Sequence, residues 1–229
     1  MKVIQFGYDS DNLGYLIHDG GEAIAIDPGD PGFVLDYIRK EGLRLKEIRN
    51  THSHFDHTSG NRVMADKTGA PIVDSTNFLP FSFGEEVIEV IPTPGHTRDS
   101  VCFQGGGWII TGDTLFIANV GNCLPGLVRD FRGSLTKLLE LPEKTVIYPG
   151  HDYTERSILR AREIEHDNAD ITRFWTEYNP PPIASTIGDE KRINPYLRTD
   201  ELAVITYLDE KGQPTATGFE RFKSFLAVN

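Results

Sequence analysis

Cysteine is scarce in this sequence, and so are long apolar runs. The two cysteines among 229 residues, Cys102 and Cys123, cannot build a disulfide framework, so the composition fits a reducing compartment. No apolar stretch is long enough to span a bilayer, and no charged start followed by a long apolar stretch marks a signal peptide. We therefore expect a cytoplasmic protein without a membrane segment.

Positive charge is also in short supply. The chain has 23 lysines and arginines against 34 aspartates and glutamates, which gives a formal net charge of −11. An acidic surface repels nucleic-acid phosphates and anionic lipids, so we expect no nucleic acid and no membrane as a general partner. The charge is still compatible with a small anionic substrate held by a local basic patch.

The chain has no internal repeats and changes texture once, near His151. Its length suits one large domain, or one domain with a small appendage. Before that point, short β-branched runs punctuated by Gly and Pro predict strands at LGYLIH, EAIAID, LKEIRNT, APIVD, EVIEVIPT, SVCFQ, GWIITGD and KTVIYPG. We predict a mixed α/β body over residues 1–152 and a mostly helical part over residues 153–229.

Helical periodicity appears between the strands and throughout the last third. PGFVLDYIRKEG predicts a helix from Pro31 that ends before a C′ glycine at Gly42, and SLTKLLEL predicts a second helix capped by Ser134. A long charged helical run comes later and is ended by the prolines of residues 179–182. Two further helices are predicted from Glu201 onward, around a DEKGQP turn.

The stretch RNTHSHFDHTSGN stands out by its ligand-type residues. It places three histidines and one aspartate within six residues, although the chain has only seven histidines. It follows a predicted strand, and His52 and His54 point the same way in extended chain. Histidine and aspartate are ligands of zinc and of similar first-row metals. We interpret the stretch as metal-binding, and the alternative for this stretch alone is a solvated polar turn.

Three other predicted strands end in the same way. VIEVIPTPGHT runs into His96, WIITGDTLF into Asp113, and TVIYPGHDY into His151. Each time an apolar strand ends, a glycine allows a sharp turn, and the next residue is of metal-ligand type. Because strand ends gather at one edge of a layered α/β fold, we expect these residues to lie together. The sequence therefore predicts a metal site at that edge.

Taken in order, THSHFDH, PGHT, GDTLF and PGHDY resemble the metallo-β-lactamase fold in its hydroxyacylglutathione hydrolase (glyoxalase II) branch. The resemblance covers nearly the whole chain, because ASTIGDEKRINPYLR is similar to the Ser-Thr, acidic and Asn-Pro-aromatic segment of that branch. It implies a four-layer αββα sandwich of α/β (α+β) class with a helical C-terminal extension.

The resemblance also implies two divalent metal ions at the edge where the predicted strands end. Zinc is the first choice of metal, and iron and manganese are the alternatives. The implied ligands of the first metal are His52, His54 and His96. Those of the second metal are Asp56, His57 and His151, and Asp113 is implied to bridge the two. Seven N/O ligands exceed what one tetrahedral zinc needs, yet they suit two metals that share a carboxylate. Asp56 and Asp113 are the implied catalytic residues, and Asp56 would also orient the attacking hydroxide.

The implied reaction is metal-dependent hydrolysis of a small-molecule thioester by a metal-bridged hydroxide. S-(2-hydroxyacyl)glutathione, such as S-D-lactoylglutathione, is the implied substrate, and Tyr153 matches a tyrosine that contacts glutathione in relatives.

Relatives carry Gly-Cys-Gly-Lys/Arg after GDTLF, whereas Asn122 and Leu124 stand at those positions here. We name Asn122 as a substrate contact, and Arg129 or Arg132 as the substitute cation, because a carboxylate needs a charge-assisted partner. The alternative for either arginine is a solvated place on the surface.

Two other functions stay open at this point. A mononuclear iron persulfide dioxygenase of the same fold carries a similar cluster, and RDFRG at residues 129–133 resembles its signature. The long helical segment after the last histidine favours the hydrolase. The third reading is a metallohydrolase for another thioester or ester, or a binding protein, although the complete ligand set argues against lost catalysis. We expect a monomer or a small homo-oligomer.

Overall fold

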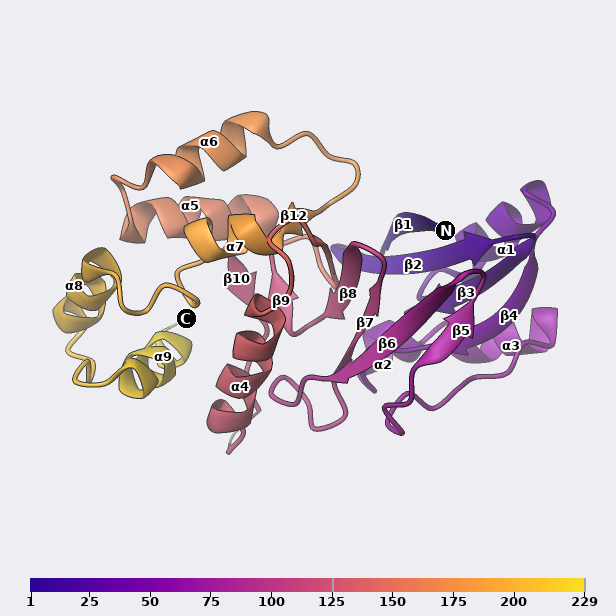
Figure 1. The fold of residues 1–229 in the computed structure, drawn as a ribbon, viewed down its shortest axis with the longest axis horizontal. Coiled ribbons are helices and arrows are strands. Elements are labelled where there is room, and N and C mark those ends of the chain that lie inside the picture. Colours follow the sequence, from indigo (N-terminus) through magenta and orange to yellow (C-terminus); the bar gives the residue numbers. More distant parts are fainter. Residues whose placement is uncertain (125, 229) are drawn as a thin grey trace.

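Two β-sheets stacked face to face form the centre of the computed structural model, which describes residues 1–124 and 126–228 (Figure 1). Pro125, in the stretch of sequence after GDTLF, and Asn229, the last residue of the predicted helical part, lie outside the described residues. The first sheet has the strand order β1-β2-β3-β4, with bounds Lys2–Tyr8, Asn12–Asp19, Glu22–Ile26 and Arg44–Arg49. The second has the order β12-β11-β8-β7-β6-β5, with bounds Ser185–Thr186, Val146–Pro149, Trp108–Gly112, Val101–Gly105, Glu86–Pro92 and Phe81–Phe83.

Side chains alternate between the two faces of each sheet, and along β2 and β3 both faces are buried. Along β2, Tyr15 and Ile17 point into the core between the sheets, where Phe103 of the second sheet meets them. Leu16 points the other way and packs with α1 (Pro31–Lys40) and α3 (Asn61–Thr68). Strands buried on both faces read as continuous apolar runs, which explains LGYLIH and EAIAI.

The outer face of the second sheet is covered by α4 and by the C-terminal helices. Cys102, Ile109 and Ile147 of this face pack with α4, α7, α8 and α9 in one core. The bounds of α4 to α9 are Val128–Leu139, Thr154–Ile164, Ala169–Glu177, Ile187–Ile193, Leu202–Glu210 and Gly218–Ala227. The layers therefore run α, β, β, α, which confirms the predicted four-layer sandwich with a helical C-terminal region.

Two predictions of local structure are wrong. APIVD forms no strand; Ile72 contributes only a single bridge, to Ile48 of β4. Ser134 is not an N-cap, because α4 begins six residues earlier at Val128 and Ser134 is buried inside it. Its hydroxyl donates to the carbonyl oxygens of Asp130 and Pro94, at 3.0 and 2.9 Å, and so ties the helix to the PGHT loop.

Other helices agree with the sequence or refine it. Asp30 caps α1 by accepting from the backbone N–H of Phe33, and Gly42 follows the helix with a positive φ of 66°, as predicted for a C′ glycine. The helical run after His151 is divided into α5 and α6, with Asn168 as the second N-cap. The sequence did not predict α7, which starts with a capping box between Thr186 and Asp189.

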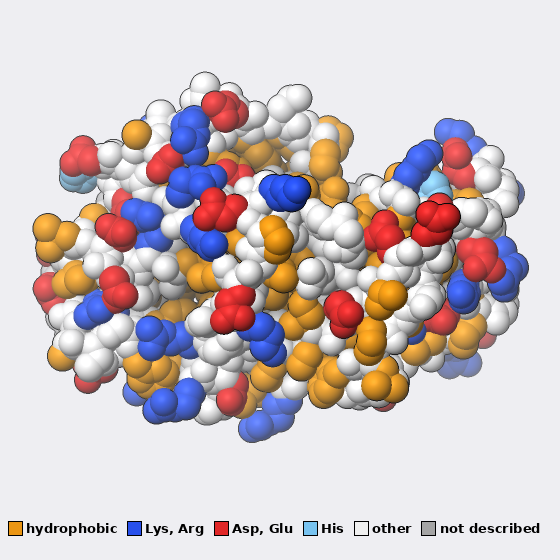
Figure 2. Space-filling view, in the orientation of Figure 1, with side chains coloured by type: hydrophobic (Ala, Val, Ile, Leu, Met, Phe, Trp, Pro, Cys, Tyr) orange, Lys and Arg blue, Asp and Glu red, His pale blue; other side chains and the backbone are white. Residues whose placement is uncertain are grey.

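Two short elements complete the edge of the sandwich that bears the predicted ligands. Helix α2 spans Phe55–Thr58, and a two-stranded ribbon is formed by β9 (Leu115–Phe116) and β10 (Asn119–Val120). Acidic and basic side chains are interspersed over the face of the molecule in Figure 2. Among the described residues, no helix has the length and apolar character that crossing a membrane requires.

Candidate metal centre

Five histidines and two aspartates converge beyond the ends of four strands. His52, His54 and the short helix α2 follow β4, His96 follows β6, Asp113 follows β8, and His151 follows β11. Their donor atoms fall into three overlapping groups in which all atoms lie within 4.8 Å of one another. The groups are His52, His54 and His96; His52, His57 and Asp113; and Asp56, His57 and His151.

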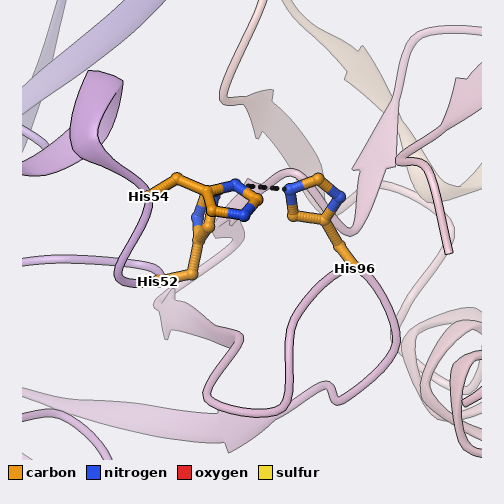
Figure 3. A group of neighbouring side chains, drawn as sticks. All are labelled: His52, His54 and His96. Atoms are coloured by element: carbon orange, nitrogen blue, oxygen red, sulfur yellow. Dashed lines mark hydrogen bonds between the residues drawn. The ribbon is translucent and has the colours of Figure 1, made fainter. Parts of the chain in front are cut away.

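The first group can be seen in Figure 3. The imidazoles of His52 and His54 come from the loop after β4, and His96 reaches them from the opposite loop. Nε2 of His96 lies 3.0 Å from Nδ1 of His54, which in turn lies 2.9 Å from Nε2 of His52. Three ring nitrogens therefore point at one small volume.

Asp113 lies between the first group and the third. Its Oδ1 is 3.4 Å from Nε2 of His57, and its Oδ2 is 3.3 Å from Nε2 of His151 and 3.5 Å from Nε2 of His96. Oδ1 is buried and has no hydrogen-bond partner among the described residues. A buried carboxylate oxygen needs a compensating partner, and a metal ion supplies one.

Close approach, more than turn geometry, explains the glycine before His151. A Cβ on Gly150 would lie 2.3 Å from Oδ1 of Asp113, so any side chain there would displace the carboxylate. The expectation of a sharp turn holds better at Gly112, whose φ is 50° and whose added Cβ would lie 2.5 Å from Oγ1 of Thr51. Both glycines make room for the ligand cluster.

Asp27 orients two of the histidines from the interior of the protein, one directly and one through Thr51. It is fully buried, and it accepts hydrogen bonds from the backbone N–H of Thr51 at 2.9 Å and from the Thr51 hydroxyl at 2.7 Å. Nδ1 of His57 lies 3.1 Å from Asp27 Oδ2, and Nδ1 of His52 lies 3.0 Å from the Thr51 hydroxyl. Asp27 directly follows β3, so it shares the position after a strand end that marks the proposed ligands.

The hairpin of β1 and β2 supplies further orienting groups that the sequence did not reveal. Nδ1 of His151 donates to Oδ1 of Asp11 at 2.8 Å, and the amide of Asn12 donates to Oδ2 of Asp56 at 2.9 Å. Tyr8 donates to the backbone carbonyl of Asp56 at 2.9 Å. Such partners fix the orientation of ligands, and their loss weakens metal binding in other proteins. The dipeptide DN alone gave no signal, because Asp and Asn are ordinary turn residues.

These partners determine which ring nitrogens face the centre. The carboxylates of Asp27 and Asp11 only accept, so Nδ1 carries the hydrogen in His57 and in His151. In the neutral rings the lone pairs then lie on the Nε2 atoms, which are 3.3 Å apart. Two lone pairs at this distance repel unless a cation lies beside them, so the donor set fits metal ions.

The electrostatic field of the aspartate carboxylates favours positive charge within the ligand cluster. Burial lowers the pKa of His57, yet Asp27 and Asp56 overcome it and raise that pKa to about 11. Burial raises the pKa of Asp113, but the hydrogen bond with His151 and the charge of His57 lower it to about 2. The hydrogen bond with His57 holds the pKa of Asp56 well below its usual range. Ionised carboxylates that favour a proton on histidine also favour a metal cation.

A cavity of about 880 Å³ opens beside His96 and Asp113. Tyr153 and Asn122 line it, and the ring of Tyr153 stacks on His151 with centroids 5.0 Å apart. The backbone carbonyl of Asn122 also accepts from Nδ1 of His96 at 2.8 Å. The guanidinium of Arg129 lies over the ring of Phe219, 4.9 Å from its centre, and Arg129 is not among the described residues of the cavity wall.

Comparison with known proteins agrees with this geometry. The model of the metallo-beta-lactamase superfamily matches residues 9–87 and 74–151, and that of the hydroxyacylglutathione hydrolase C-terminus matches residues 152–225. A hydroxyacylglutathione hydrolase of Maricaulis maris is 35% identical over 89% of this chain and 89% of its own length. One of Anaeromyxobacter dehalogenans is 32% identical over 96% of this chain and 94% of its own length.

Among solved structures, ETHE1 from Myxococcus xanthus superposes with a TM-score of 0.72 at 26% identity and covers 99% of this chain and 90% of that one. The fold, the clustered His and Asp ligands and the full-length relatives lead to one assignment. The chain belongs to the hydroxyacylglutathione hydrolases of the metallo-beta-lactamase superfamily, which are metallohydrolases.

Proposed function

We propose that this protein hydrolyses the thioester bond of S-(2-hydroxyacyl)glutathione, such as S-D-lactoylglutathione, at a centre of two divalent metal ions. Zinc is the first choice for both ions. The observation that carries the proposal is Asp113, a buried carboxylate that lies between two histidine groups and lines a substrate-sized cavity. The names of the full-length relatives support the choice of substrate.

The proposed ligands keep the roles that the resemblance implied. His52, His54 and His96 would hold one ion, Asp56, His57 and His151 the other, and Asp113 would bridge them. Bound metals would supply hydroxide at neutral pH and would polarise the thioester carbonyl. All seven ligands come from residues 1–152, so the proposed catalytic body is that segment, and residues 153–229 shape the cavity.

The chain itself would position water and substrate. Asn12 and Tyr8 fix Asp56, whose carboxylate could then accept a hydrogen bond from the attacking water. Asp113 is buried, which strengthens its electrostatic interactions. Tyr153, ordered by stacking on His151, would contact the thiol carrier, and Asn122, which also lines the cavity, would be a second contact.

The remaining proposals concern partners and location. The net charge of −11 supports a small-molecule substrate rather than nucleic acid or an anionic membrane. The two free cysteines support a cytoplasmic location, and we propose a monomer or a small homo-oligomer.

The test is turnover of S-D-lactoylglutathione beside lactoyl thioesters of other thiols, with metal content measured on the same sample. Hydrolysis of the glutathione thioester with about two metals per chain is expected. One iron per chain together with oxygen uptake on glutathione persulfide would overturn the hydrolase proposal in favour of the dioxygenase.

A further inference from the structure

The cavity beside the metal centre extends well beyond the space that an acyl group needs. His96 and Asp113 form one end, and α5 forms the far wall together with Tyr196 and Phe225. Helix α5 lies beneath α6 and beside α7 in Figure 1. A volume of about 880 Å³ is in the range of pockets that bury whole small molecules. The cavity therefore has room for a thiol carrier beyond the acyl group.

Two arginines carry all the fixed positive charge of the described cavity wall. Arg156 and Arg160 lie four residues apart on α5, so their side chains leave the same face of the helix. Glu155 and Glu163 also line the cavity, yet within the described part of the chain neither arginine forms an ion pair. Like charges at this spacing repel and weaken a helix, and a bound anion would remove that repulsion.

Both guanidinium groups are ordered by neighbouring residues. The guanidinium of Arg156 lies over the ring of Tyr153, 4.5 Å from its centre, and that ring stacks on His151 at an interplanar angle of 8°. Nη2 of Arg160 donates to the hydroxyl of Tyr207 at 3.0 Å and to the carbonyl of Val228 at 3.3 Å. Ordered donors lose little freedom when a ligand binds.

Arg160 also retains an unmet hydrogen-bonding group. Its Nε is buried and has no partner among the described residues, which is unfavourable for a charged donor. The charges of Arg160 and Arg156 both lower the pKa of Tyr196, against the burial that raises it to about 12. The two cations therefore act on the same part of the cavity.

We propose that Arg156 and Arg160 form a subsite for a carboxylate of the thiol carrier. This inference rests on the proposed thioester hydrolysis and adds the residues that select the carrier. Arg156 is separated from His151 by a single aromatic ring, so a carrier held there by its acidic end has its sulfur near the metal ligands. A local cationic pair is needed because the chain as a whole carries a charge of −11 and repels anions.

The test compares Arg156→Gln with the native enzyme on lactoyl thioesters of four thiols. These are glutathione and N-acetylcysteine, which carry carboxylates, N-acetylcysteamine, which is neutral, and coenzyme A, which carries phosphates. The readout is the ratio of kcat/KM on each anionic thioester to kcat/KM on the neutral one. We expect Arg156→Gln to lower the ratio for glutathione by about tenfold, mainly through KM, because charge-assisted hydrogen bonds are lost.

Arg156→Glu should lower that ratio further, since it reverses the charge. Arg162→Gln is the matched control, because Arg162 is an exposed arginine of the same helix outside the cavity wall, and it should leave the ratio unchanged. An equal fall on all four thioesters, or an unchanged ratio in Arg156→Gln, would overturn the subsite. An arginine-dependent preference for coenzyme A would overturn the carboxylate assignment. A native enzyme that hydrolyses none of the four overturns the proposed function instead.

Discussion

Oδ2 of Asp27 lies 3.1 Å from Nδ1 of His57, and both side chains are completely buried. The same oxygen accepts from the hydroxyl of Thr51, which meets Nδ1 of His52. One carboxylate outside the proposed ligand set thus fixes a histidine of each proposed metal. Its backbone has a φ of 51°, a strained value that a non-glycine residue adopts only when its surroundings hold it there.

Asp27→Asn should reduce both metal content and activity. The amide keeps the shape of the carboxylate but replaces one acceptor oxygen with a donor, which faces hydrogens on Thr51 and His57. Loss of such orienting partners costs about 10–100-fold in metal affinity or activity. Chelator titration followed by metal analysis measures the change in metal affinity. Asp30→Asn, in the same DPGD turn, is the control, because Asp30 caps α1 and touches no proposed ligand.

Asp113→Ala should abolish activity and sharply reduce bound metal per chain. The alanine leaves His57, His96 and His151 without the carboxylate that lies between them. Metal analysis and turnover on the same preparation measure both effects. Full metal occupancy with normal turnover would refute the bridging role.

The sequence revealed the ligands because they lie in the short segments that follow the ends of apolar strands. Strand ends of a layered fold share one edge, so chain positions as distant as His52 and His151 could be assigned to one site. The resemblance then supplied the sandwich and the helical extension. Local errors arose where a single strand-like or cap-like pattern was read without its context, as at APIVD and Ser134.

The orienting residues could not be predicted, because their roles depend on contacts between distant segments. Asp11 reaches His151 across 140 positions, and its turn has an ordinary sequence. The arginines of α5 were hidden for a related reason: their shared face points into a cavity whose other walls come from the β9–β10 ribbon and the C-terminal helix. A charged helical run gives no sign of which face is partnered.

Gly150→Ala tests the packing around Asp113. A single methyl group would lie 2.3 Å from Oδ1 of Asp113 and 3.1 Å from Cε1 of His57, so the carboxylate must shift from its place among the histidines. We expect lost metal and activity falling by about 100-fold or more, since misplacement by about 1 Å has such effects in enzymes. Gly133→Ala is the control: nothing lies within 4 Å of its added Cβ, and its place inside α4 should make the change stabilising by about 0.5–1 kcal/mol. Normal metal content in Gly150→Ala would show that the cluster tolerates the shift.

A buried carboxyl links the C-terminal region to the site and should make stability depend on pH. Glu190 accepts hydrogen bonds from the backbone N–H of Ala118, from Asn194 and from Ser185, and it thereby ties α7 to the turn between β9 and β10. Burial raises its pKa from 4.5 to about 8, although these hydrogen bonds lower it. Between those two values the folded protein holds one proton more than the unfolded chain.

Stability from Glu190 is therefore fully present below about pH 4.5 and is lost as the pH rises toward 8. The native protein should lose free energy of unfolding relative to Glu190→Gln across this window, by up to about 1.4 kcal/mol per pH unit. Urea denaturation of both proteins between pH 5 and pH 9 measures the difference, with chelator present so that metal binding does not contribute. Glu140→Gln, at an exposed position after α4, should run parallel to the native protein. If the native protein and Glu190→Gln ran parallel as well, Glu190 would be ionised throughout, held so by its three donors.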